Sequence, residues 1–230
     1  MRRHSAHIES IAMVARQLAE LRTEVVFTGG AIVGLLLTDS AAPEVRPTDD
    51  VDVIVGIATY AGYASLQEEL RKLDFTHDMD GPNCRFILNG LKVDVMPSDG
   101  KVLGFTNRWY EFAMRSAINH PLSDGISIRV ISAPAFIATK LEAFHDRGQG
   151  DFLISHDIED IIAVVDGRPE LLNEIKASDV TLREYVRDNF AAFVSDRVFV
   201  DAIGMNLLPD EGSQARARII IKRMAEISEL

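Results

Sequence analysis

Three aspartates crowd into the stretch RPTDDVDVIV, residues 46–55, which runs directly into an apolar, β-branched segment. Residues two apart in a strand project from the same face, so Asp50 and Asp52 should lie side by side while the valines between and after them face a core. Two carboxylates at that separation repel each other, and without a cation between them one is driven to bind a proton. The spacing therefore indicates a cation site at the start of a buried strand.

A third acid comes from a predicted hairpin. The segments CRFIL and LKVDVM flank Asn89-Gly90, a strong signal for a two-residue turn because both of its positions need positive φ. In the second segment Asp94 faces away from the apolar side. If this strand lies beside the first, three aspartates converge; taken by itself, Asp94 could equally be an exposed strand acid.

Carboxylates without imidazole or thiolate suit Mg²⁺ or Mn²⁺. Such ions serve in-line nucleotidyl transfer, in which they hold a triphosphate, lower the pKa of the attacking hydroxyl and neutralise the leaving group. We therefore predict Asp50, Asp52 and Asp94 as metal ligands and catalytic residues, with Asp94 also helping to deprotonate an acceptor hydroxyl.

The segment Thr28-Gly29-Gly30 lies between the predicted strand EVVF and a predicted short helix at residues 31–37. A glycine pair there lets backbone amides approach phosphates with no Cβ in the way. Strand-glycine-helix turns also occur for steric reasons, but this one precedes the Asp-x-Asp strand by about twenty residues. We predict that Thr28, Gly29 and Gly30 bind the nucleotide.

Hydrophobic periodicity gives the elements that must position these residues. Strand patterns end near residue 131, and helical patterns follow with no Gly/Ser linker between. The sequence thus predicts an α/β domain at residues 1–131 and an all-helical domain at 132–230. The predicted helices span residues 7–22, 31–37, 60–73, 134–145, 155–165, 169–176, 182–200 and 214–227; the predicted strands are EVVF, DVDVIV, CRFIL, LKVDVM and GISIRVIS.

Composition narrows the class of protein. The 230 residues suffice for one large or two small domains, and a formal charge of −11 opposes nucleic-acid binding over a broad basic surface. No apolar run approaches a membrane span, and the helical, glutamate-containing N-terminal stretch is unlike a signal peptide. The single cysteine, Cys84, excludes an internal disulfide. We expect a cytoplasmic protein with no membrane partner.

The glycine pair, the Asp-x-Asp strand and the later aspartate resemble the pattern of the DNA polymerase β-like nucleotidyltransferase superfamily. RPTDDVDVIV looks like the Arg-x-Thr-x-Asp-Ile-Asp form of AbiEii-type nucleotidyltransferases, a group that contains toxins of bacterial toxin-antitoxin systems. TKLEAFHDRGQGDFLISHDIEDII, residues 139–162, is similar to the Lys-Leu-x-Ala, Arg-Gly and Asp-Leu-x-Asp-Ile pattern of that group. The resemblance covers most of residues 25–167.

The resemblance implies a mixed five-stranded sheet with flanking helices that holds the metal, and a helical domain that closes over the nucleotide. By the same resemblance Lys140 contacts the triphosphate and Asp157 supports the active site. Asp49 departs from the basic or neutral residue common at its position, and we expect it outside the ligand set.

The implied reaction transfers NMP from an NTP such as ATP to an acceptor hydroxyl. The resemblance favours a tRNA 3′ end as acceptor and an antitoxin as protein partner. A protein hydroxyl or a small molecule such as an aminoglycoside is the alternative acceptor. A non-catalytic module that binds a nucleotide or a partner protein is an alternative of another class, although such a module has no reason to keep mutually repelling acids.

Overall fold

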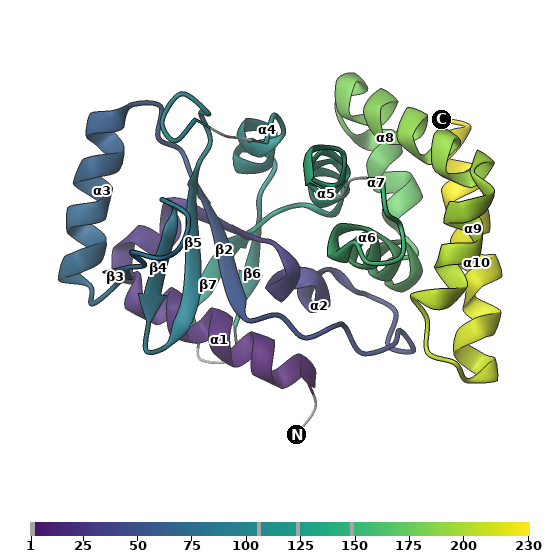
Figure 1. Cartoon of the computed structure of the whole chain (residues 1–230), viewed down its shortest axis with the longest axis horizontal. Helices are drawn as coiled ribbons and strands as arrows, with labels where there is room; N and C mark the ends of the chain where they lie inside the picture. The colour runs from purple at the N-terminus through teal and green to yellow at the C-terminus, as the bar shows by residue number, and fades with distance from the viewer. Residues whose placement is uncertain (1–2, 105–106, 123–124, 148–149) are drawn as a thin grey trace. The chain divides into compact units, whose positions relative to one another are not determined.

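The computed structural model describes residues 3–104, 107–122, 125–147 and 150–230 (Figure 1). The chain divides into two compact units. The first, termed here the sheet unit, comprises Met1–Gly34 and Arg46–Ser132, and the second, the helical unit, comprises Leu35–Val45 and Ala133–Leu230. The sequence places residues 1–131 in one domain, whereas the contacts assign Leu35–Val45 to the helical unit.

A mixed sheet forms the centre of the sheet unit. In the described residues it has seven strands in the order β3-β4-β5-β2-β1-β7-β6. β2 runs parallel to β5 and β1 parallel to β7, while the other neighbours are antiparallel. The prediction of an α/β fold with a mixed sheet is confirmed. The strands are β1 (Val25–Thr28), β2 (Asp50–Val55), β3 (Thr76–His77), β4 (Arg85–Leu88), β5 (Leu91–Pro97), β6 (Ile118–Pro121) and β7 (Ser127–Val130).

The predicted count of five strands is corrected to seven. Both additional strands, β3 and β6, lie at the edges of the sheet. β3 has two residues, which is too short to show an alternation. In β6 none of the four residues is buried, so no apolar periodicity marks it. Neither edge strand contains a buried residue, so no apolar pattern indicates them in the sequence.

The alternation predicted for the Asp-x-Asp strand is present in β2. Val51 and Val53 are fully buried, whereas Asp50 and Asp52 are partly exposed. One side of the strand therefore belongs to the core of the sheet unit, and the other presents the two carboxylates.

Helices flank this sheet, and two of them differ from the sequence prediction. α1 ends at Gln17 and gives way to the 3₁₀ helix η1, because Ala19 adopts a positive φ of 49°. α4 is absent from the sequence prediction, because its six residues are too few to show a helical periodicity. The elements are α1 (Arg3–Gln17), η1 (Ala19–Thr23), η2 (Gly30–Ile32), α2 (Val33–Leu36), α3 (Tyr60–Lys72) and α4 (Tyr110–Arg115); α2 ends inside the helical unit.

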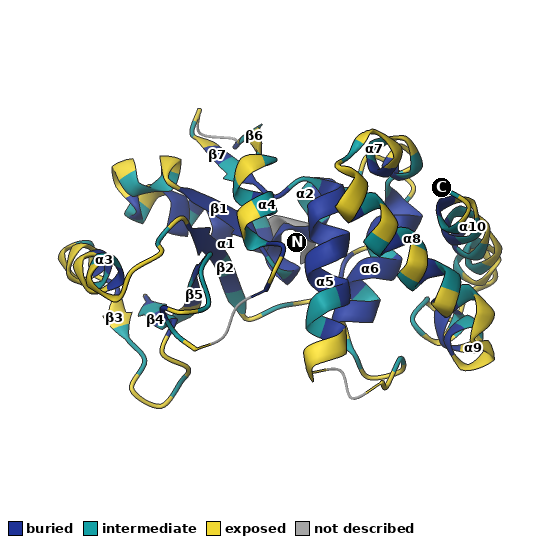
Figure 2. Ribbon diagram, turned by 90° about the horizontal axis from the view of Figure 1, so that it is seen from above, coloured by how far each residue is buried: buried dark blue, intermediate teal, exposed yellow. Residues whose placement is uncertain are grey.

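The helical unit is built around α5 and α6, which Figure 2 shows coloured mainly as buried. Four phenylalanines add an aromatic cluster with ring centroids 4.8–5.8 Å apart: Phe144, Phe152, Phe193 and Phe199. In the described ranges no helix is long and apolar enough to cross a membrane. The helices are α5 (Ala133–Arg147), α6 (His156–Gly167), α7 (Leu171–Ala177), α8 (Val180–Ser195), α9 (Arg197–Met205) and α10 (Glu211–Ser228).

The single helix predicted at residues 182–200 is two helices, α8 and α9. The break falls at Asp196, whose backbone is extended and whose side chain accepts a hydrogen bond from the Val198 amide at 2.8 Å. An aspartate in that role caps a new helix and satisfies an otherwise unpaired amide. Apolar periodicity continues across the break, which is why the sequence predicts one helix.

Polar contacts tie the segment Leu35–Val45 to the rest of the helical unit. The Gly167 carbonyl accepts hydrogen bonds from the Thr38 and Asp39 amides, both at 2.9 Å. Arg216 on α10 donates from Nε to both carboxylate oxygens of Asp166, at 2.8 and 2.7 Å, and from Nη2 to Asp39 at 2.8 Å. Asp166 is 2% exposed, so Arg216 compensates a buried charge as well as anchoring the segment.

Replacing Arg216 should therefore destabilise the helical unit. Arg216→Met leaves the Asp166 carboxylate buried without its cation, and we expect a loss of about 3 kcal/mol in the free energy of unfolding. The measurement is urea unfolding of the full chain followed by far-UV circular dichroism. Arg218→Met, on the exposed side of the same helix, is the matched control and should change stability by less than about 0.5 kcal/mol. Equal midpoints for the two variants would contradict the assignment.

Candidate active site

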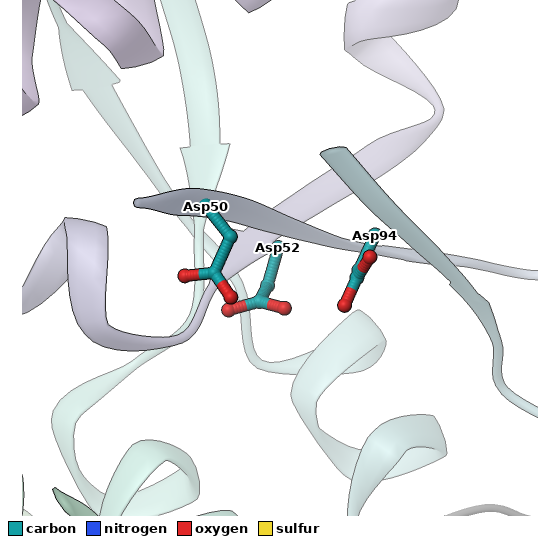
Figure 3. Close-up of side chains that lie close together, drawn as sticks. All are labelled: Asp50, Asp52 and Asp94. Carbon is teal, nitrogen blue, oxygen red and sulfur yellow. The ribbon is translucent and has the colours of Figure 1, made fainter. Parts of the chain in front are cut away.

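The register of the sheet brings the predicted acids together. Asp52 on β2 lies opposite Thr28 on β1 and opposite Asp94 on β5. Directly opposed residues of neighbouring strands project from the same face, so these three side chains share one side of the sheet. Asp50 reaches that side as well, two residues before Asp52. Figure 3 shows the carboxylates of Asp50, Asp52 and Asp94 close together.

The geometry of the cluster suits a divalent cation. Asp50, Asp52 and Asp94 each offer one carboxylate oxygen, and these oxygens all lie within 4.8 Å of one another. Asp94 is buried, and the other two are partly exposed, so the cluster is open on one side. An all-oxygen donor set with room for water or phosphate oxygens is what Mg²⁺ and Mn²⁺ prefer. The cluster could therefore hold a metal ion.

Asp50 is positioned by the loop that precedes it. Its Oδ1 accepts a hydrogen bond from Thr48 Oγ1 at 2.5 Å. The Thr48 amide in turn donates to Nε2 of the buried His7, on α1, at 3.3 Å. Helix α1 thus fixes the approach of the chain to β2, and through Thr48 it restricts the orientation of the first carboxylate.

Asp94 has a cation as its cross-strand partner. Arg85 on β4 donates from Nε to Asp94 Oδ1 and from Nη2 to Oδ2, both at 2.8 Å. Two parallel hydrogen bonds between a guanidinium and a carboxylate are stronger and more directional than a single one. The hydrogen bonds to Asp94 raise the pKa of Arg85 above its ordinary value, so Arg85 is charged at neutral pH.

Gly29 is required beside the acids for a steric reason. Its φ is +74°, and a Cβ at this position would lie 1.7 Å from Asp52 Oδ2. No other residue type fits without displacing that carboxylate. A Cβ on Gly30 would meet the Arg46 guanidinium at 2.6 Å, and the far end of that side chain can move aside. The glycine pair predicted as a phosphate turn is thus in contact with the carboxylate cluster.

Lys140 and Asp157, the two site residues predicted from the second sequence block, lie in the helical unit. Lys140 Nζ is 3.0 Å from Asp157 Oδ1 and 2.7 Å from Asp160 Oδ2, and all three residues are buried. Arg147 also donates to both oxygens of Asp157, at 3.1 Å. Gly148, which follows Arg147 in the block, is outside the described residues.

The charges in this buried group support one another. Burial lowers the pKa of the Lys140 ammonium, but the carboxylates of Asp160 and Asp157 outweigh burial and hold that pKa above its ordinary value. Burial raises the pKa of Asp157, but Lys140 and Arg147 outweigh it, and the net direction is downward. Lys140 is therefore an ammonium ion and Asp157 a carboxylate at neutral pH.

The structure brings five of the predicted residues into one place: Thr28, Gly29, Asp50, Asp52 and Asp94, with Gly30 next in the chain. Asp49 is exposed and is not a member of the three-carboxylate cluster. Sequence reasoning missed Arg85, His7 and the contact of Arg46 with Gly30. The hairpin could have revealed Arg85, because Arg85 and Asp94 are equally distant from the Asn89-Gly90 turn. The meeting of His7 with Thr48 has no comparable signal in the sequence.

Comparison with known proteins gives a likeness of fold. No protein-family model matches the chain, and no curated protein sequence matches it. Among solved structures, the crystal structure of JHP933 from Helicobacter pylori aligns with a TM-score of 0.51 and 10% identity over 100% of this chain and 93% of that chain. The solution structure of the antibiotic-resistance factor ANT(2'')-Ia aligns with a TM-score of 0.46 and 14% identity over 82% of this chain and 95% of that chain. The likeness to JHP933 shows a shared fold.

Gly29→Ala should disturb both stability and the carboxylates. The backbone strain and the overlap with Asp52 together should cost about 2–4 kcal/mol of unfolding free energy. Gly90→Ala is the matched control, because Gly90 also has positive φ, +85°, but its added Cβ meets no atom within 4 Å. It should cost about 1 kcal/mol. Urea unfolding of both variants measures the difference, and equal losses would show that the contact with Asp52 is unimportant.

Lys140→Met should destabilise the chain by about 3–5 kcal/mol near neutral pH, because it leaves two buried carboxylates without their shared cation. Pairing lowers the pKa of Asp157, so its contribution is present above the unfolded value of about 3.9 and is lost as the pH falls through the folded value. The gap between wild type and variant should accordingly narrow on acidification. Urea unfolding across pH tests this, with the exposed Lys176→Met as control; a gap that widens in acid would refute the pairing.

Proposed function

We propose that this chain is a metal-dependent nucleotidyltransferase that transfers NMP from an NTP to an acceptor hydroxyl. The observation that supports this most directly is the cluster of Asp50, Asp52 and Asp94, whose oxygens lie within 4.8 Å of one another at the Gly29 turn. Carboxylates so close together repel one another, and a bound cation would offset that repulsion. A site that binds a cation together with a nucleotide therefore accounts for the arrangement.

Asp50 and Asp52 would hold the divalent cation, with Asp94 as the third ligand. When bound, the metal neutralises phosphate charge, orients the triphosphate and lowers the pKa of the acceptor hydroxyl. In the transfer, the acceptor oxygen bonds to the α-phosphorus, the bond from that phosphorus to the β-phosphate oxygen breaks, and pyrophosphate leaves. We assign to Asp94 a share in accepting the hydroxyl proton.

Gly29 and Gly30 support a nucleotide at the same place. The place of a Cβ at Gly29 is taken up by the Asp52 carboxylate and at Gly30 by the Arg46 guanidinium, so the turn brings backbone without side chains next to the cluster and next to a cation that can attract phosphate. Thr28, the cross-strand neighbour of Asp52, extends the same face. The roles of Lys140 at the triphosphate and of Asp157 in support, and closure by the helical domain, stay predictions that derive from the sequence resemblance.

For the acceptor we propose a tRNA 3′ end, as in a toxin of the AbiEii type with a cognate antitoxin. The support is the sequence resemblance of RPTDDVDVIV and of residues 139–162. A net charge of −11 confines any RNA contact to a small number of cationic residues. A protein hydroxyl and a small molecule of the aminoglycoside type are the acceptors to test next.

The test is a transfer assay with purified full-length chain, Mg²⁺, each α-³²P-labelled NTP in turn, and total cellular RNA. Asp50→Asn and Asp52→Asn should each lower label transfer by about 10³-fold or more, since each removes a ligand of the metal. Asp49→Asn is the matched control, a neighbouring exposed acid outside the cluster, and should retain activity within about threefold. Transfer that is unchanged in the two ligand variants would refute the proposal.

Other outcomes separate the alternatives. Label that enters protein or an added aminoglycoside, and not RNA, would replace the tRNA acceptor while leaving the reaction in place. Saturable binding of NTP with no transfer to any of these acceptors would favour the non-catalytic binding module.

A further inference from the structure

Arg85 sits at the edge of the proposed metal site. It is bound to both oxygens of Asp94 at 2.8 Å, and one of those oxygens lies within 4.8 Å of ligand atoms on Asp50 and Asp52. The side chains of Arg85 and Asp94 are 22% and 12% exposed, so water screens them only in part. A dication held by the three aspartates would therefore lie a few ångströms from a guanidinium, and the two would repel each other strongly.

The contact does not prevent Asp94 from acting as a ligand. A carboxylate oxygen has two lone pairs, so each oxygen of Asp94 can accept from Arg85 and still bind another group. Arg85 instead changes the electrostatics of the site, because it cancels one of three negative charges that attract the cation. Its hydrogen bonds also fix the orientation of the carboxylate. The first effect weakens metal binding and the second favours it.

We propose that the first effect dominates: Arg85 keeps the affinity of the site for a free divalent cation low, so that the cation binds together with the nucleotide. The triphosphate adds several negative charges beside the guanidinium. With these charges present, the attraction of the site for the cation exceeds the repulsion from Arg85. This inference rests on the proposed function, of which it specifies the order of binding. Arg85 acts on the site through its charge and is not itself a metal ligand.

Two kinds of variant separate charge from orientation. Arg85→Gln removes the charge and keeps a hydrogen-bond donor for Asp94, and Arg85→Met removes both. Arg85→Lys keeps the charge and loses the two-pronged contact. Lys92→Gln is the matched control, because Lys92 lies opposite Asp50 on the same face and is also a cation next to the cluster.

The measurement is Mn²⁺ binding to full-length chain, followed by the electron paramagnetic resonance signal of free Mn²⁺, without nucleotide and then with a non-hydrolysable NTP analogue. Without nucleotide, Arg85→Gln and Arg85→Met should lower the Kd for Mn²⁺ by about tenfold or more, and Arg85→Lys should stay within about threefold of wild type. Lys92→Gln should have a smaller effect than Arg85→Gln. With the analogue, wild type and Arg85→Gln should differ by less than they do without it.

Circular dichroism and thermal unfolding verify that each variant is folded, and either neutral variant suffices for the comparison. The proposal is overturned if the neutral variants bind Mn²⁺ as wild type does, or if they and Arg85→Lys all bind it more weakly, which would make orientation the dominant effect. Absence of Mn²⁺ binding in wild type and in every variant, with and without analogue, would refute the metal site itself and with it the proposed function. Asp52→Asn shows which binding belongs to the cluster.

Discussion

Repulsion among three carboxylates is the constraint around which the sheet unit is arranged. The register of β2 and β5 forces Asp52 and Asp94 into adjacent positions on one face, and Asp50 follows two residues earlier. Each acid has a different neighbour: Thr48 donates a hydrogen bond to Asp50, Gly29 leaves space for the Asp52 carboxylate, and Arg85 pairs with Asp94. The acids remain close because sheet hydrogen bonding and a buried valine face fix the backbone that bears them.

In the helical unit, buried carboxylates are paired with cations, and these ion pairs stabilise the fold. Lys140 lies between Asp157 and Asp160, and Arg216 lies between Asp166 and Asp39. Each cation is shared by two acids: Lys140 joins the consecutive helices α5 and α6, whereas Arg216 joins α10 to α6 and to the segment Leu35–Val45. Buried charges need such partners, because desolvation of an isolated carboxylate costs several kcal/mol. In the sheet unit three carboxylates lie within 4.8 Å of one another and Arg85 pairs with Asp94, and this crowding of acids is what distinguishes a candidate metal site from these structural ion pairs.

Local patterns were sufficient for the parts of the site that depend on local geometry. The alternation of valine and aspartate predicts the two faces of β2, and Asn89-Gly90 predicts the turn between β4 and β5, where both residues do have positive φ. The parallel pairing of β2 with β5 is a long-range contact that no local pattern predicts. From the sequence, the convergence of the three aspartates follows only if these two strands are neighbours. The break at Asp196 was hidden because apolar periodicity continues through it. Leu35–Val45 is held in the helical unit by contacts such as that between Asp39 and Arg216, which are 177 residues apart along the chain, and no local pattern in the sequence indicates such a contact.

The two-residue turn has a consequence for how this hairpin tolerates changes in length. Arg85 and Asp94 lie opposite each other because Arg85 precedes Asn89 by as many residues as Asp94 follows Gly90. A single residue inserted or deleted between Asp94 and the turn would shift the register by one and rotate Asp94 to the opposite side of the sheet, where the valines pack. Most surface turns accept such changes in length. Here one added residue would place a carboxylate in the core and leave Arg85 opposite an apolar side chain. The number of residues between Arg85 and Asp94 is therefore fixed by their pairing.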